Sequence, residues 1–160
     1  WKSEAAVIPQ SWSPDGSAIA CLGVEKDGGS DIWMLPLGGG RPASRFFESP
    51  FVEAQPDFSP DGRWIAYASN ESGRFEVYVR PYPGPGGKVQ VSNDGGFEPA
   101  WRRDGKELFY RNGEKMMAVA LRPGSPGFFG KPVTVFEKSG LYRELVEIQS
   151  GLVSEDAVIS

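Results

Sequence analysis

The sequence predicts an all-β fold, a β-propeller of about three four-stranded antiparallel blades. An aromatic residue followed by an Asp-Gly turn is written three times, as SWSPDG (11–16), DFSPDG (57–62) and AWRRDG (100–105). The copies recur at the interval of roughly 40 to 50 residues that is typical of propeller blades. The 21 Gly and 14 Pro residues indicate many tight turns, and therefore many short strands.

The repeated turn has a structural explanation in each copy. Pro presets one central φ, Asp accepts hydrogen bonds from nearby backbone N–H groups, and Gly adopts positive φ. The same chemistry at three equivalent corners is what a repeat fold needs, whereas an active site needs it once. We therefore predict that these residues form turns and are not catalytic: Asp15, Gly16, Asp61, Gly62, Asp104 and Gly105.

Each copy continues with three strand-like segments after the aromatic first strand. The second strands are expected at 18–22, 64–67 and 108–110, where apolar residues run together or alternate. The third strands are expected at 31–35, 76–80 and 116–121, and weaker fourth strands at 44–47, 88–92 and 133–137. Hairpins would join the four strands into one blade, which gives blades of about 1–47, 48–92 and 93–137.

The tail, residues 138–160, carries no fourth Asp-Gly turn. Leu141, Leu145 and Ile148 have roughly helical spacing, so a short amphipathic helix is one reading. A strand that completes another blade is the alternative reading, and the sequence does not distinguish the helix from the strand. The run RPYPGPGG (80–87) is interpreted as a stiff connection between the third and fourth strands of the second blade, with an aromatic-groove ligand as the alternative.

The pattern of aromatic-Ser-Pro-Asp-Gly, then an apolar strand, then a strand such as EVYV, resembles TolB-like, WD-repeat-like propeller repeats over residues 8 to about 137. The second copy is nearest to the family pattern, and the third departs from it with Arg102-Arg103. The sequence of the second and third copies is also similar to extracytoplasmic propellers of bacterial serine/threonine kinases and to oligopeptidase propellers. The resemblance implies a bacterial protein in a periplasmic or other extracytoplasmic location.

Composition excludes several classes of function. The net charge of −4 argues against a nucleic-acid partner, and no apolar run approaches the length that inserts into a membrane. The chain begins with Trp1 and is expected to be a piece of a longer protein. Cys21 is the one cysteine, and its apolar surroundings predict a buried, inert thiol.

Catalytic chemistry is not visible in the sequence. There is no His, no Gly-x-Ser-x-Gly elbow, no phosphate loop and no His or Cys metal cluster. We therefore expect no enzyme activity, no cofactor and no metal. Three hypotheses follow: a non-catalytic module for protein interaction or ligand sensing, an accessory propeller that gates an oligopeptidase-like hydrolase, or a structural fragment that assembles into a ring.

In a propeller the links between blades and the hairpins between second and third strands share one face, where partners commonly bind around the channel mouth. The polar and charged residues expected there, as the candidate site for a protein or peptide partner, are Glu53, Asn70, Arg74, Asp94, Glu98 and Arg111, with Glu71 and Asn112 beside them. An ordinary solvated rim without a partner is the alternative.

Three blades do not close a ring, because propellers need about four to eight. We expect two copies to form a six-bladed homodimer through their terminal blades, with a truncated monomer and other ring-closing or swapped oligomers as the alternatives. The apolar residues expected to face water in a lone chain are Ile19, Cys21, Ile32 and Met34 of the first blade, or the residues that alternate with them, and Leu108, Tyr110, Val119 and Leu121 of the third.

Overall fold

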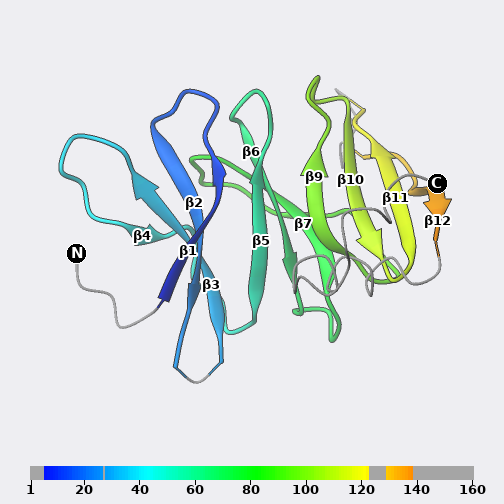
Figure 1. The fold of residues 1–160 in the computed structure, drawn as a ribbon, viewed down its shortest axis with the longest axis horizontal. Coiled ribbons are helices and arrows are strands. Elements are labelled where there is room, and N and C mark those ends of the chain that lie inside the picture. The colour runs from blue at the N-terminus through cyan, green and yellow to red at the C-terminus, as the bar shows by residue number, and fades with distance from the viewer. Residues whose placement is uncertain (1–5, 27, 123–128, 139–160) are drawn as a thin grey trace, which may run out of the picture.

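The computed structural model describes residues 6–26, 28–122 and 129–138, and within them every regular element is a β-strand. The strands form three separate four-stranded antiparallel sheets, so the predicted all-β fold of three blades is confirmed. The sheets follow one another from left to right in Figure 1. The predicted tail from residue 139 onward lies outside the described residues.

The strands of each blade follow chain order from the inner to the outer edge. Blade one holds β1 (Ala6–Trp12), β2 (Ala18–Val24), β3 (Ser30–Pro36) and β4 (Ser44–Arg45). Blade two holds β5 (Glu53–Phe58), β6 (Trp64–Ser69), β7 (Glu76–Pro81) and β8 (Val89–Gln90). Blade three holds β9 (Phe97–Trp101), β10 (Glu107–Asn112), β11 (Lys115–Ala120) and β12 (Val133–Glu137).

Two of the fourth strands are shorter than the sequence predicts. β4 and β8 keep only two residues each, because the following side chains leave the sheet to pack elsewhere. Phe46 and Phe47 pack against the core between blades one and two, and Val91 is buried in the core between blades two and three. The weak fourth strands therefore end where the chain begins to join one blade to the next.

The first strands of the blades, β1, β5 and β9, contact one another and form the inner wall of the arc. Each carries a bulge at the same place, where its pairing with the second strand shifts register by one residue. Bulges bend a strand and re-aim its side chains. The shared bulge therefore repeats one backbone shape along the propeller axis.

Two apolar cores hold the blades together, one at each interface between neighbouring sheets. Ile32, Met34, Phe58, Ile65 and Tyr67 are among the buried residues between blades one and two. The second core includes Val77, Val79, Leu108, Tyr110 and Val119 between blades two and three. Blade two is buried on both faces, whereas the first and third blades each have only one neighbour.

The apolar residues predicted to meet water are mostly buried, and this expectation is corrected. Ile32 and Met34 lie on the face of blade one that packs on blade two, and Leu108, Tyr110 and Val119 lie in the second core. Ile19 and Cys21 are buried as well, and Leu121 is half-buried. For Ile32, Met34 and the residues of blade three, the error arose because strand alternation fixes two faces but does not say which one meets the neighbouring blade. Ile19 and Cys21 do lie on the other face of blade one, and they are nevertheless buried.

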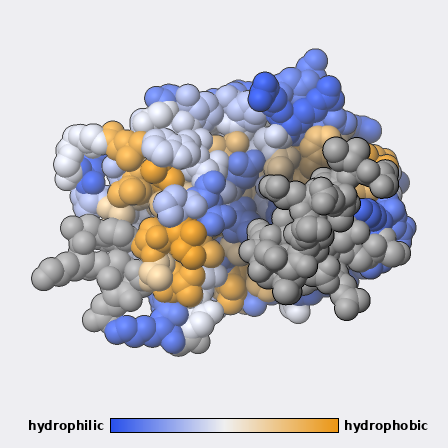
Figure 2. Space-filling model, viewed as in Figure 1, coloured by the Kyte–Doolittle hydropathy of each residue, from blue (hydrophilic) through white to orange (hydrophobic). Residues whose placement is uncertain are grey.

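The large apolar side chains that are exposed belong to other positions. Trp12 on β1 is 61% exposed, although the equivalent Phe58 of blade two is 5% exposed. Trp12 pairs with Ile19, and so shares the outer face of blade one. Val133, Val135 and Phe136 of β12 are also exposed. Apolar colour gathers over the left part of Figure 2, where Figure 1 places blade one.

Candidate binding site

The three Asp-Gly turns lie between the first and second strands of each blade. Asp15 Oδ1 accepts hydrogen bonds from the Ser13 hydroxyl at 2.6 Å and the Ser17 amide at 3.0 Å. Gly16, Gly62 and Gly105 have φ of 71°, 69° and 71°, which only glycine adopts without strain. The bonds to Asp15 lower its pKa to about 2, which marks a carboxylate used to hold a turn.

The second and third turns are also held by hydrogen bonds to their Asp side chains. Asp61 accepts from the Ser59 hydroxyl at 2.6 Å and from the Arg63 amide at 3.1 Å. Burial raises the pKa of Asp61, but these hydrogen bonds outweigh burial and leave the pKa lowered. The third turn has Arg102 in place of serine, and Asp104 accepts from the Lys106 amide at 3.0 Å and pairs with Arg102 at 3.4 Å.

The opposite face carries the residues predicted around the channel mouth. Asn70 Oδ1 accepts a hydrogen bond from the Val52 amide at 3.0 Å, so its side chain ties the hairpin of blade two to the preceding link. Glu53 is 1% exposed and accepts from the Ser69 hydroxyl at 3.4 Å. Burial raises the pKa of Glu53. Glu53 therefore lies beneath the surface and not on it.

Arg74 and Asp94 belong to one network that joins blades two and three. The Arg74 guanidinium lies 2.7 Å from Oε1 of the buried Glu76 and 3.2 Å from Asp94. Glu76 also accepts from the Gly95 amide at 2.9 Å and from the Ser92 hydroxyl. These contacts fix the link after β8, and they leave the two predicted residues engaged with their own chain.

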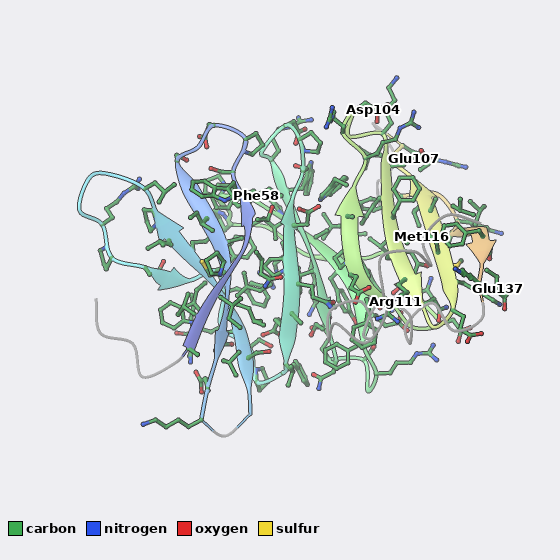
Figure 3. The ribbon with its side chains drawn as sticks, in the orientation of Figure 1. Phe58, Asp104, Glu107, Arg111, Met116 and Glu137 are labelled. Carbon is green, nitrogen blue, oxygen red and sulfur yellow. The ribbon has the colours of Figure 1, made fainter. Side chains whose placement is uncertain are left out.

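Glu98 and Arg111 form a bidentate ion pair on the third blade. Arg111 Nε lies 2.7 Å from one Glu98 oxygen, and its terminal nitrogen lies 3.1 Å from the other. Figure 3 places Arg111 at the end of β10 away from Asp104 and Glu107, which lie near the turn. Of the predicted site residues, the structure brings together two pairs, Arg74 with Asp94 and Glu98 with Arg111.

A groove of about 370 Å³ runs across the inner strands of all three blades. Gln10, Gln55 and Glu98 line it, one from each of β1, β5 and β9. Gln55 and Glu98 have φ of 55° and 52°, a left-handed conformation that non-glycine residues adopt at a cost. The Gln55 side-chain oxygen accepts the Glu98 amide at 2.9 Å. We call this feature the axial groove.

Asp57, at the floor of the axial groove, joins all three blades. One carboxylate oxygen accepts from the Ser11 hydroxyl at 2.9 Å, and the other accepts from the Trp101 amide at 2.9 Å. Burial raises the pKa of Asp57. The sequence prediction missed this residue, although a carboxylate where the other copies have Ser11 and Ala100 was a visible signal.

A larger cleft, of about 780 Å³, opens between blades two and three on the face with the turns. Trp64, Trp101 and Leu121 give it apolar walls, and Asp61, Arg102 and Glu107 are among its charged residues. Arg102 pairs with Glu107 at 2.6 Å, so these charges neutralise one another. The sequence placed the site on the opposite face and gave no indication of this cleft.

The described residues contain no group of three or more metal-binding side chains that could hold an ion. They likewise include no helix long and apolar enough to cross a membrane. The described residues do offer concave surfaces, among them the polar axial groove and the mixed cleft between blades two and three.

Three antiparallel sheets packed face to face around inner strands define a β-propeller. The model of the TolB beta propeller domain family matches residues 2–125, and the chain belongs to that family. Uncharacterized protein Atu1656 of Agrobacterium fabrum is 33% identical over 67 residues, which are 42% of this chain and 22% of that protein. The Tol-Pal system protein TolB of Bordetella pertussis is 39% identical over 49 residues, 31% of this chain and 11% of that protein.

Solved structures show the same fold at low identity. A putative TolB from Agrobacterium tumefaciens has a TM-score of 0.67 at 20% identity, covering 82% of this chain and 50% of that one. TolB from Acinetobacter baumannii has a TM-score of 0.65 at 18% identity, covering 86% and 34%. The tricorn protease has a TM-score of 0.57 at 18% identity, covering 78% and 14%. The chain thus spans half or less of each of these relatives.

Proposed function

We propose that the chain is a non-catalytic propeller module that binds a peptide segment of another protein in the axial groove. The observation that carries this proposal is the left-handed backbone of Gln55 and Glu98 at equivalent bulges, with both residues lining the groove. Backbone strain of this kind costs about 1–3 kcal/mol at each residue and collects at functional sites. Bulges are likewise frequent beside binding sites.

The lining of the groove suits an extended peptide. Gln10 and Glu98 are exposed: Gln10 presents its amide to a ligand backbone, and the Glu98 carboxylate, which Arg111 holds in place, keeps further acceptor positions. Pro56 and Pro99 also line the groove, but both are buried beneath the exposed residues. The family of TolB propellers and the likeness to TolB structures support a protein-binding role and a periplasmic or other extracytoplasmic location.

The test is a selection of peptides from a displayed library against the purified chain. Peptides that bind would then be measured against Gln10→Arg, which fills the groove, and against Ser44→Arg, an exposed change on β4. We expect Gln10→Arg to weaken binding at least tenfold and Ser44→Arg to leave it unchanged. Equal binding by Gln10→Arg, or turnover of the peptide by the chain, would contradict the proposal.

We also propose that two copies close a six-bladed ring, in which the exposed face of blade one meets blade three of the partner. The exposure of Trp12, against the burial of Phe58 at the same position of blade two, supports a missing neighbour on that side. A twofold axis along the channel would cover both open faces and repeat the same contact twice. The mass of the chain in solution tests this proposal.

A further inference from the structure

Arg80 of β7 is a cation without a carboxylate partner among the described residues. Its cross-strand partner is Ile65, so its side chain lies on the face that packs against blade one. The guanidinium lies over the Phe47 ring, 4.3 Å from its centroid. Arg80 Nε is buried and donates no hydrogen bond, and the Tyr67 hydroxyl, whose pKa is raised by burial and lowered in part by Arg80, is a neighbouring polar group.

An arginine in this position needs an acceptor. Arg80 as a whole is half-buried, but its buried Nε–H without a partner loses the hydrogen bond that water would have supplied. The Phe47 ring offsets part of that loss through its negative face, but a ring does not accept a directed hydrogen bond from Nε. An unsatisfied group of this kind points to a bound ion or water.

A pocket of about 380 Å³ lies beside Arg80. Phe46 and Pro81 form part of its wall, and the rest comes from residues 83–86 of the strap, the segment 82–88 that joins β7 to β8. The strap is the run interpreted from the sequence as a stiff connection, and it does make that connection. Apart from the Arg80 guanidinium, the side chains lining the pocket are apolar.

The strap is held at both ends. The Tyr82 amide donates to the Arg63 carbonyl at 2.8 Å. At the far end, Lys88 pairs with Glu71 and lies 5.5 Å from the centre of the Tyr78 ring. A Cβ on Gly86 would lie 2.4 Å from a carbon of Pro81, so the strap packs closely against the end of β7. The pocket is therefore a built feature of the blade.

We propose that this pocket binds a peptide carboxylate carried by an apolar residue, as at an apolar C-terminus, with Arg80 as the anchoring residue. One lining cation matches a single negative charge, whereas a phosphate dianion would need more. Guanidinium recognises carboxylate through parallel N–H bonds. Phe46 and the prolines offer an apolar surface, and the side chain of such a residue would be removed from water by packing against it.

This site shares no lining residue with the axial groove, so the two proposals can fail separately. The probes are N-acetylphenylalanine and its carboxamide, titrated into the ¹⁵N-labelled chain while the amides of Gly84 and Gly86 are followed. The acid is expected to shift these amides and to bind at least tenfold more tightly than the carboxamide. Equal binding of acid and carboxamide would overturn the proposal.

Substitutions of Arg80 test whether its positive charge holds the carboxylate. Arg80→Met is expected to remove binding of the acid, and Arg63→Met, which changes an exposed arginine outside the pocket, is expected to leave it unchanged. Arg80→Lys keeps the charge without the planar fork, and should weaken binding at least fivefold even if Arg80→Met fails to fold. Full binding by a folded Arg80 variant, or tighter binding of inorganic phosphate than of the acid, would contradict the assignment.

Discussion

The Asp15 carboxylate makes the stability of its turn depend on pH. Its folded pKa of about 2 lies below the ordinary value of 3.8, so the folded state binds fewer protons than the unfolded state between those values. The stabilisation is complete above pH 4 and is lost as pH falls through about 2. Protonation of the carboxylate weakens the bonds from Ser13 and Ser17.

Asp15→Asn should therefore remove a pH-dependent part of the stability. Urea unfolding of the wild type and the variant would be compared at pH 5 and at pH 2.5. We expect the difference in unfolding free energy to be larger at pH 5 and to shrink at pH 2.5. A difference that stays constant over this range would show that the carboxylate charge does not stabilise the turn.

Asp61→Ala tests the turn of blade two. The substitution removes the acceptor of the Ser59 hydroxyl and of the Arg63 amide, and should cost about 1 kcal/mol of unfolding free energy. Asp61→Asn keeps one acceptor and serves as the matched control, with a smaller loss. If Asp61→Ala abolished peptide binding while leaving the unfolding free energy unchanged, the structural role of the turn would be wrong.

At the scale of the strands, the inner wall depends on Asp57. Its two oxygens connect Ser11 of β1 and the Trp101 amide of β9 to β5, so this side chain bonds across both blade interfaces. Asp57→Ala leaves these donors unpaired and should cost about 2–3 kcal/mol, as hydrogen bonds to a charged group do.

Asp57→Asn is the control for Asp57→Ala. Its amide oxygen accepts from Trp101 and its amide nitrogen donates to the Ser11 oxygen, so the shape of the contact is kept. Because burial raises the pKa of Asp57, removing the charge also removes a desolvation cost. Chemical denaturation at pH 7 should place Asp57→Asn within about 1 kcal/mol of the wild type. Equal losses for both variants would show that the charge itself is needed.

The turns and the strand order could be predicted from the sequence, because both are local: Pro-Asp-Gly encodes a corner and alternating apolar residues encode a strand. The short fourth strands could not, because Phe46 and Phe47 leave β4 for a core made by another blade. Topology predicted the end of the blade at which Glu98 and Arg111 lie, but not that Glu53 is buried. The engagement of the candidate-site residues, such as Arg74 with Glu76, depends on side-chain geometry that spacing does not encode.

At the scale of the whole molecule, the arc has two unequal ends. Blade two is covered on both faces, whereas Trp12 at the outer face of blade one and Val133, Val135 and Phe136 on β12 remain exposed. A second copy would bury these side chains, and each fully buried apolar side chain stabilises by about 1.5–3 kcal/mol. The proposed ring would therefore be stabilised by burial of apolar side chains at both ends of the arc.

Light scattering coupled to size-exclusion chromatography measures closure most directly. At micromolar concentration we expect a folded species with the mass of two 17.4 kDa chains. Trp12→Arg, which places a charge on the outer face of blade one, should shift the mass toward one chain, and Ser17→Arg on the turn should not. A stable, folded species of 17.4 kDa for the wild type would contradict the claim.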